Sequence, residues 1–384
     1  MPDDWKINMR TIIDRIKDNV TLQNVGIEYL SEELLPTDID RKDDDMTVKN
    51  NEEFICFEDQ GITKDGKINK NGIKIKVQKE EKSRNIFKYF IDGTLKTVYL
   101  GEVVYPNVFP LMFTEVASAC LERDSMHKLH KKLFKNQNYL IFPFSLVPDT
   151  LLNQLLNINN NSILFVDSTN YKTENDLPID LRERAGAIAR YKMHEIEIDV
   201  MNEITKEIET QKTNYMAIID GSISNIQFVT SASDKIIALT KSPSFKPLLR
   251  FGQDVMKVGT LLSALDYAER TVVFKKENVN VLVWYIRIFK RKNLSEPLEG
   301  IVKIEFPLPK NFDPEILSYK SSIDEVKKLL DKINNISSAI LYETFVNSYP
   351  NNRWSSNIYP IAKTEDFMKT NMKSILYIRG SIKW

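Results

Sequence analysis

The sequence Ile-Phe-Lys-Tyr-Phe-Ile-Asp-Gly-Thr, residues 86–94, is the stretch on which the expected fold depends. A largely apolar run leads directly into Asp92-Gly93, and the strand pattern resumes at residues 97–100, which predicts a first pair of strands joined at an acidic turn. The sequence Tyr-Met-Ala-Ile-Ile-Asp-Gly-Ser, residues 215–222, repeats the motif. Two strands of one core sheet are therefore expected to end in the same acidic turn.

A long amphipathic helix is predicted between the two copies of the motif, over residues 181–210. At about 100° per residue, one face carries five apolar residues: Met193, Ile196, Val200, Ile204 and Ile208. Glu197 lies within that apolar stripe, whereas Glu195 points elsewhere. A carboxylate on a core-facing stripe is costly unless it is neutralised, and either a metal ion or the nearby Arg190 would do this.

Glu197 and the two motif aspartates, Asp92 and Asp220, are candidate metal ligands. An Asp-Gly pair is usually only a turn, as expected for Asp65-Gly66 in its polar surroundings. Asp92 and Asp220 instead follow apolar runs, which places both carboxylates at the ends of buried strands, where sheet-based sites gather their ligands. The adjacent glycines let other groups approach closely. Oxygen ligands of this kind suit Mn²⁺ or Mg²⁺, and a pair of such ions catalyses phosphodiester hydrolysis well.

The remaining segments complete the expected α/β fold, a mixed sheet flanked by helices. Residues 110–134 suit a helix with a basic end, and residues 162–167 are typical of a buried strand. Residues 1–85 form an accessory segment in this interpretation, ahead of a core at residues 86–384. Within that segment we expect an amphipathic helix that packs on a partner or on its own core, a solvated acidic loop and a β hairpin, at residues 7–16, 38–45 and 51–80.

Composition limits the expected partners and compartment. The chain has 384 residues with 53 basic and 53 acidic side chains, so its net charge of zero gives no overall attraction to DNA or to an anionic membrane. Only Cys56 and Cys120 are present, which excludes a disulfide framework and fits the reducing cytoplasm. Residues 139–158 are apolar but interrupted by prolines and polar residues, and the N-terminus lacks a signal pattern. Neither a membrane span nor export is expected.

The order of several short motifs resembles the NurA nucleases. The strand-Asp-Gly-Ser/Thr motif occurs twice, with an acidic helix before the second copy, and further segments are similar to the family in the same order. They are Ile-Ile-Ala-Leu-Thr-Lys-Ser at residues 236–242, Val-Trp-Tyr-Ile-Arg at 283–287, Val-Lys-Ile-Glu-Phe-Pro at 302–307 and Ile-Tyr-Pro-Ile-Ala at 358–362. The resemblance covers residues 86–372 and leaves the first 85 residues unmatched.

The resemblance implies a ribonuclease-H-like core that hydrolyses DNA with two Mn²⁺ or Mg²⁺ ions, held by Asp92, Glu197 and Asp220. Glu365 stands where the family usually has a His or an Asp, and it is expected as a fourth ligand. A Glu can bind a cation, but a His could also move protons near neutral pH. The rate or the metal preference of this chain is therefore expected to differ from that of its family.

The resemblance also implies contacts with DNA and with a partner. Lys241 is expected to contact phosphate, and Ser242 and Tyr359 are further candidates for DNA binding. The chain would act as a symmetric homodimer on single- or double-stranded DNA delivered by a HerA-type hexameric ATPase. End resection during repair and defence against foreign DNA are both compatible with this expectation.

Other candidate chemistries are weaker. Four basic residues between two predicted strands either grip the DNA backbone or form a solvated hairpin end: Arg287, Lys290, Arg291 and Lys292. His127 and His130 have the spacing of metal ligands on a helix, but neighbouring lysines repel cations, so a zinc site is rejected. The sequence has neither of the common glycine-rich nucleotide loops, so processive cutting would need an external motor.

Two alternatives from other classes of protein stay open. The first is a catalytically idle scaffold that docks the ATPase, and the departure at Glu365 keeps this hypothesis alive. The second is an Argonaute-like guide-binding module, which would also carry paired acids. That module would need a basic pocket for the guide phosphate ahead of the core, and the sequence shows none.

Overall fold

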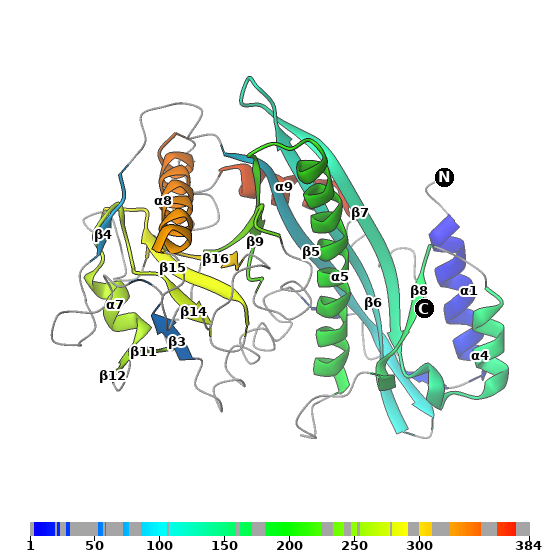
Figure 1. Cartoon of the computed structure of the whole chain (residues 1–384). Helices are drawn as coiled ribbons and strands as arrows, with labels where there is room; N and C mark the ends of the chain where they lie inside the picture. Colours follow the sequence, from blue (N-terminus) through cyan, green and yellow to red (C-terminus); the bar gives the residue numbers. More distant parts are fainter. Residues whose placement is uncertain are drawn as a thin grey trace.

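The computed structural model shows one large mixed sheet with helices on both faces (Figure 1). None of the helices in the described part of the chain is long and apolar enough to cross a membrane. The described residues are 4–19, 21–23, 28–30, 53–56, 58, 72–76, 86–105, 107–158, 162–170, 181–223, 233–241, 247–251, 254–276, 279–290, 299–308, 323–346 and 359–373. The α/β class and the mixed sheet flanked by helices are thus confirmed.

Five strands form the part of the sheet that carries the motif aspartates. They are β5 (Phe87–Tyr105), β6 (Asn107–Arg123), β7 (Leu129–Phe142), β9 (Met216–Asp220) and β10 (Ile236–Thr240). Their order across the sheet is β7-β6-β5-β9-β10. β6 runs antiparallel to β5 and β7, whereas β9 is parallel to both β5 and β10. One antiparallel strand thus lies among four parallel ones.

The sheet continues beyond both ends of this group. Past β10 follow β16 (Ile301–Pro307), β15 (Val281–Arg287), β14 (Phe274–Lys276), β3 (Glu53–Cys56), β11 (Leu248–Phe251) and β12 (Asp254–Lys257). Off this path lie β1 (Thr21–Gln23) and β2 (Glu28–Leu30), which pair with β5, and β13 (Glu269–Arg270), which pairs with β15 and β4 (Ile73–Lys74). Beside β7 lies β8 (Leu164–Asp167), a strand where one was expected, although Leu164 is 41% exposed.

Helix α5 (Leu181–Thr210) covers one face of β5, β6 and β7, and it has the predicted bounds. Its apolar stripe packs on the sheet: Val200 and Ile204 contact the cluster around Tyr89 and Ile91, and Ile196 contacts the cluster around Tyr99. Glu197, within that stripe, is 4% exposed. The periodicity therefore identified the buried face of the helix, including its one acidic member.

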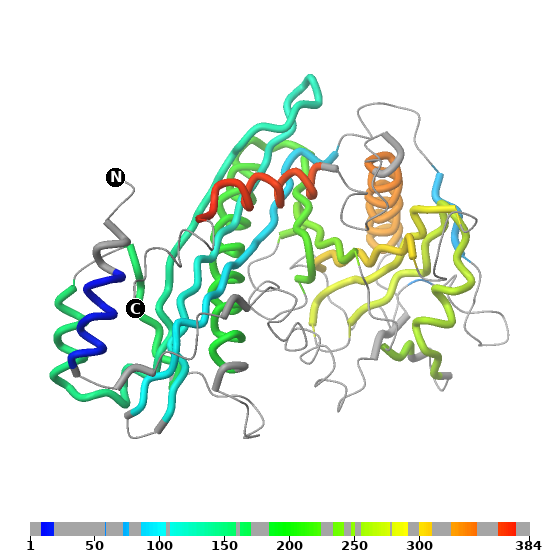
Figure 2. The backbone as a smooth tube through the Cα atoms, turned by 180° about the vertical axis from the view of Figure 1, so that it is seen from behind, coloured from blue at the N-terminus to red at the C-terminus, as the bar shows by residue number. Residues whose placement is uncertain are grey.

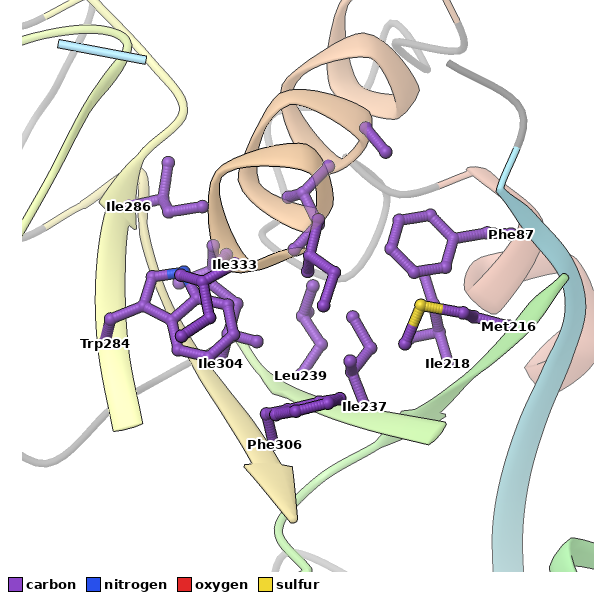
Figure 3. Close-up of a cluster of buried hydrophobic side chains, with 14 of the residues drawn as sticks. Phe87, Met216, Ile218, Ile237, Leu239, Trp284, Ile286, Ile304, Phe306 and Ile333 are labelled. Atoms are coloured by element: carbon purple, nitrogen blue, oxygen red, sulfur yellow. The ribbon is translucent and has the colours of Figure 1, made fainter. Parts of the chain in front are cut away.

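Two helices cover the opposite face of the sheet. Helix α8 (Ile323–Val346) packs on β9, β10, β15 and β16 through a cluster that includes Ile333, Trp284 and Phe306 (Figure 3). Helix α9 (Tyr359–Asn371), red in Figure 2, crosses the long strands on the face of the sheet opposite to α5. Its Thr364 hydroxyl donates to the carbonyl of Phe90 in β5. The described part of the chain also contains the short helices α7 (Val258–Ala264), η3 (Phe144–Leu146) and η4 (Ser168–Asn170).

Strand β5 runs through Asp92 and Gly93 without a turn, so the strand pair expected at this point is wrong. Both residues pair with β6, at Ala119 and Ser118. Gly93 also lacks the positive φ that a tight hairpin turn requires, in contrast to Gly221 with φ 104°. The ladder with β6 holds the Asp-Gly pair extended, because breaking it would leave backbone groups of both strands unpaired in the core.

Residues 110–134 form parts of β6 and β7, so the helix expected there is also wrong. Met112 and Val116 pack toward α5, while Leu111 and Phe113 pack on the opposite side of the sheet. A strand buried on both faces has no polar alternation, and periodicity cannot separate it from a buried helix. His127 therefore lies in a hairpin turn and not on a helix.

The N-terminal helix α1 (Asp4–Asn19) belongs to the core. Its apolar face packs beside α4 (Asp149–Leu156), with Met9, Ile12, Ile13 and Ile16 at most 2% exposed. Of the two interpretations of this helix, packing on its own core is confirmed. That apolar face is therefore covered by the chain itself.

The expected hairpin at residues 51–80 is wrong. β3 pairs with β11 and β14, and β4 pairs with β13, so each strand joins a different part of the main sheet. Pairing with distant strands therefore places the described strands of this segment, β3 and β4. Residues 38–45 and Asp65-Gly66 lie outside the described residues, and the domain boundary at residue 85 stays a prediction.

Candidate functional site

Asp92 and Asp220 lie side by side on neighbouring strands. β5 and β9 are parallel, and Ile91 pairs with Ile219, so the next residue in each strand is one of the two aspartates. Equivalent positions of adjacent strands point to the same face of a sheet. On both strands this is the face of Phe90 and Ile218, which pack in the cluster beneath α8 and α9. The two carboxylates therefore share one face.

The edge of β5 beyond Asp92 is open among the described strands. β9 ends at Asp220 and pairs with β5 only up to Ile91, and β2 begins to pair with that edge at Thr97. Side chains from both faces of the sheet can therefore meet along residues 92–96. Ligands of open α/β sheets commonly bind where neighbouring strands end.

Glu197 reaches this edge from α5, on the face opposite to Asp92. A Cβ atom on Gly93 would lie 2.4 Å from both Cδ and Oε1 of Glu197, so only glycine leaves room for the carboxylate. Gly93 is thus required by the close approach and not by its backbone conformation. The Oε2 atom of Glu197 lies 2.7 Å from Nδ1 of His194. His194 precedes Glu197 by one helical turn, and the sequence analysis did not single it out.

Lys241 places a positive charge beside the aspartates. It directly follows β10, and its Nζ lies 2.5 Å from Oδ2 of Asp220, with both side chains largely buried. Leu239 pairs with Asp220 across the two strands, so Lys241 projects from the same face of the sheet. The phosphate contact expected of Lys241 stays a prediction, because in this structure the ammonium binds a carboxylate.

Glu365 lies at the rim of this group, on α9. Its Oε1 atom is 2.6 Å from Nζ of Lys369, one turn later in the same helix, and its side chain is 31% exposed. Its charge nevertheless contributes to the raised pKa of both Asp92 and Asp220. The structure thus brings Glu365 within electrostatic reach of the two aspartates while its carboxylate is directed to Lys369.

Burial and incompletely balanced negative charge together determine the electrostatics of the group. Burial raises the pKa of Asp92 well above its usual range, and Asp220, Glu197 and Glu365 raise it further, against the lowering effect of Lys241. Burial also raises the pKa of Asp220, although Lys241 opposes this. Burial alone would lower the pKa of Lys241, but Asp220 and Asp92 raise it. Additional positive charge at this position would therefore be stabilising.

The turn after Asp220 is anchored by Glu305, a residue that the sequence analysis did not assign to the site. Oε2 of Glu305 accepts from the Ser222 hydroxyl at 2.7 Å and from the Ile223 N–H at 2.9 Å. Its Oε1 atom lies 2.7 Å from Nζ of Lys303. Glu305 is 1% exposed. The available indication was a charged residue within the apolar run of a strand, a position that requires a partner.

We define the carboxylate cluster as Asp92, Glu197, Asp220 and Glu365, with Lys241 among them. Within the described ranges, no three His, Cys, Asp or Glu side chains stand close enough together to enclose a metal ion. The donor set nevertheless fits a hard divalent cation, because all its ligand atoms are oxygens and its charge is incompletely balanced. The Glu197 carboxylate seated against Gly93 and the Lys241 ammonium at Asp220 approach the same edge of β5 from opposite faces of the sheet.

Other residues expected to bind DNA do not join the carboxylate cluster. Arg287 is fully buried, and its guanidinium donates to the carbonyls of Leu265 at 2.8 Å and Glu299 at 3.0 Å. The expectation that Arg287 binds a DNA backbone is therefore wrong, because its guanidinium is already bonded to backbone carbonyls of its own chain. Ser242 lies outside the described residues, and so does the side chain of Tyr359, whose backbone begins α9.

Comparison with other proteins adds no independent support for a role of the carboxylate cluster. No protein-family model matches the chain, and no curated protein was found to be similar to it. The chemistry of the carboxylate cluster therefore has to follow from its own residues.

Proposed function

We propose that this chain is a metal-dependent nuclease of the NurA type, which hydrolyses DNA phosphodiester bonds with two Mn²⁺ or Mg²⁺ ions. The observation that carries the proposal is the side-by-side position of Asp92 and Asp220 on parallel strands, with Glu197 seated against Gly93 at the same edge. Buried carboxylates in excess of their counter-charge are costly unless cations balance them. Bound divalent cations would balance this buried negative charge, so an activity that depends on such cations explains why the carboxylates are gathered here.

The strand order supports the ribonuclease-H-like part of the proposal. The five strands β7-β6-β5-β9-β10 form a mixed sheet with one antiparallel member, and α5 connects β8 to β9 across one face. The two aspartates fall on the neighbouring strands β5 and β9, and the glutamate falls on the helix between them in sequence. This is the arrangement of acids that the motif order implied.

The four acids of the carboxylate cluster are the cation ligands in this proposal. Asp92, Asp220 and Glu197 would hold the cations, and Glu365 on α9 would be a fourth ligand if it released Lys369. Bound divalent cations would lower the pKa of the attacking water and stabilise the charge on the leaving oxygen. Water adds to phosphorus, the bond from phosphorus to the 3′ oxygen breaks, and the products are a 5′-phosphate and a 3′-hydroxyl.

Lys241 changes partner in this mechanism. In the structure, its ammonium forms an ion pair with Asp220. In the proposed mechanism the ammonium would instead bind a non-bridging phosphate oxygen of the DNA, which is a charge-assisted contact. The same side chain would thus neutralise Asp220 first and bind substrate later.

The partners are proposed with the function. The NurA resemblance implies a homodimer that receives DNA from a HerA-type hexameric ATPase, in a cytoplasmic setting of repair or defence. The neutral net charge of the chain supports the need for delivery, because long-range attraction to DNA is weak.

A Mn²⁺ titration with single- and double-stranded DNA tests the proposed function. We expect cutting that depends on the cation, and a loss of about a hundredfold or more in Asp220→Asn, since a ligated cation contributes several kcal/mol to the transition state. The matched control is Asp234→Asn, because Asp234 also pairs with a lysine, Lys332 at 2.7 Å, but is 44% exposed. Full activity in Asp220→Asn would reject Asp220 as a ligand and the proposal with it.

A catalytically idle scaffold is the second candidate. It is favoured by two contacts that satisfy acids of the carboxylate cluster within the chain itself, namely Lys241 with Asp220 and Lys369 with Glu365. A scaffold would bind the ATPase but leave DNA intact at every Mn²⁺ concentration. The same titration, run with and without the ATPase, separates the two candidates.

A further inference from the structure

We propose that His194 is a positioning residue that fixes the carboxylate of Glu197 in the orientation needed for cation binding. This inference rests on the proposed function and extends it to a residue outside the carboxylate cluster. The inference is based on the surroundings of the two carboxylate oxygens of Glu197, one of which contacts His194 on α5 while the other faces Gly93 on β5.

On the α5 side, the imidazole binds one oxygen of Glu197. Nδ1 of His194 lies 2.7 Å from Oε2, and the two residues are one turn apart on the helix. A carboxylate only accepts hydrogen bonds, so Nδ1 carries the proton and donates it. The side chain of His194 is 25% exposed and that of Glu197 is 5% exposed, so the hydrogen bond is largely shielded from water.

On the β5 side, the other oxygen faces the backbone next to Asp92. Oε1 and Cδ of Glu197 occupy the space that a Cβ of Gly93 would take, at 2.4 Å. The two oxygens therefore have different surroundings: Oε2 is held by His194, and Oε1 is directed to the strand that carries Asp92. Without the hydrogen bond at Oε2, the carboxylate can rotate about its terminal torsion, which is broad and weakly restrained.

Groups behind the ligands of a metal site commonly fix their orientation. Loss of such a partner typically weakens metal affinity or activity by roughly 10- to 100-fold. The second His–carboxylate pair in the described residues offers a control, because His130 lies 2.7 Å from Asp124 but at the exposed tip of the β6–β7 hairpin. An alanine substitution at His194 removes a His–carboxylate pair at the carboxylate cluster. The same substitution at His130 removes a comparable pair far from it.

The test measures Mn²⁺ affinity by calorimetry and DNA cutting as kcat and KM, for wild type, His194→Ala, His194→Asn and His130→Ala. We expect His194→Ala to weaken Mn²⁺ binding and to lower kcat by roughly 10- to 100-fold, with little change in KM. In His194→Asn the amide N–H takes the place of Nδ1, so it should recover most of the affinity. His130→Ala should match wild type.

Mn²⁺ affinity in His194→Ala equal to that of wild type would overturn the proposal and leave the proposed function standing. An equal loss in His194→Asn and His194→Ala would also overturn it, because a purely structural role does not distinguish them. If His194→Ala does not fold, His194→Leu keeps the bulk and takes its place. Wild-type protein that neither binds Mn²⁺ nor cuts DNA would reject the proposed function, and this inference would fall with it.

Discussion

At the scale of single residues, Asp92 is the clearest case of a group whose charge opposes folding. It is 7% exposed, and its hydrogen bond from the Gly93 N–H does not balance burial and the neighbouring acids, which raise its pKa. An acid whose folded-state pKa is raised destabilises the fold at pH values above that pKa. The penalty disappears as the pH falls through the raised value toward the usual carboxyl range.

Asp92→Asn is therefore expected to stabilise the metal-free protein at neutral pH. The gain in free energy of unfolding should be on the order of 1 kcal/mol or more, because an uncompensated buried charge is removed. Denaturant titrations at pH 7 and pH 4.5 measure it, and the gain should shrink at the lower pH, where wild-type Asp92 takes up a proton. A variant that is less stable than wild type at pH 7 would contradict this assignment of charge.

Substitution of Gly93 tests the position of Glu197 without changing any carboxylate residue. Alanine can adopt the extended backbone of a strand, but its Cβ would stand 2.4 Å from the Glu197 carboxyl carbon, so we expect Gly93→Ala to displace Glu197. Mn²⁺-dependent cutting should fall by about tenfold or more. In a Glu197→Ala background the same change should have little further effect, as a double-mutant cycle would show.

Gly72→Ala is the matched control for that experiment. Its Cβ would also meet a glutamate, at 2.3 Å from Oε2 of Glu269, but beside strand β13. Equal activity in Gly93→Ala and wild type would mean that Glu197 can leave Gly93 without loss, and its role as a ligand would have to be given up.

At the scale of elements, Glu305 in β16 holds the turn that follows β9. Burial alone would raise the pKa of Glu305, but Lys303 and Ser222 lower it below its usual range. An acid with a lowered folded-state pKa stabilises the fold above the usual carboxyl pKa, and this contribution is lost as the pH falls through the lowered value. Its effect on stability is thus opposite in sign to that of Asp92.

We expect Glu305→Gln to lower the free energy of unfolding at pH 7 by roughly 3 kcal/mol, because Lys303 loses its buried counter-charge. At about pH 3 the difference from wild type should be smaller. Glu203→Gln is the control, since Glu203 pairs with Lys135 but is 53% exposed, and exposed pairs contribute little. Equal losses in both variants, or a Glu305→Gln loss that is independent of pH, would contradict an anchoring role.

The elements differ in how far the sequence could predict them. Helix α5 and strand β9 were predictable, because one has a clear apolar stripe and the other is a short apolar run with an acidic end. β6 was not, because both its faces are buried and its apolar residues do not alternate. The continuous path of β5 through Asp92 was not predictable either, since Asp-Gly usually turns and only pairing with β6 prevents it.

The site was predictable to a similar extent, for related reasons. Asp92, Glu197 and Asp220 stood out because each is an acid in an apolar context, and the structure gathers them at one edge. His194 and Glu305 were missed, because their partners are set by helix rotation and by a strand far along the chain. Arg287 was misassigned because a basic residue at a strand end resembles a surface residue until its carbonyl partners are known.

At the scale of the whole molecule, the N-terminal segment is interleaved with the rest of the chain. α1 packs beside α4, β1 and β2 pair with β5, and β3 lies between β11 and β14. The apolar face of α1 is thus already covered within the chain. We expect a translocase to contact other surfaces, and deletion of α1 to destabilise the fold.

The proposed delivery of DNA by a motor gives a prediction at the same scale. Adding a HerA-type hexameric ATPase with ATP should raise cutting strongly on long duplexes and much less on short single strands, which reach the carboxylate cluster by diffusion. Cutting rates on both substrates, with ATP or a non-hydrolysable analogue, measure this contrast. Equal stimulation of both substrates, or none, would contradict threading of DNA by the partner.

The central claim, that Asp92 and Asp220 hold divalent cations, is tested most directly by anomalous X-ray scattering from crystals grown with Mn²⁺. We predict anomalous peaks in contact with both aspartates and with Glu197, and an Nζ atom of Lys241 that has moved away from Asp220. Mn²⁺ bound elsewhere, with Lys241 still on Asp220 in the same crystals, would contradict the account.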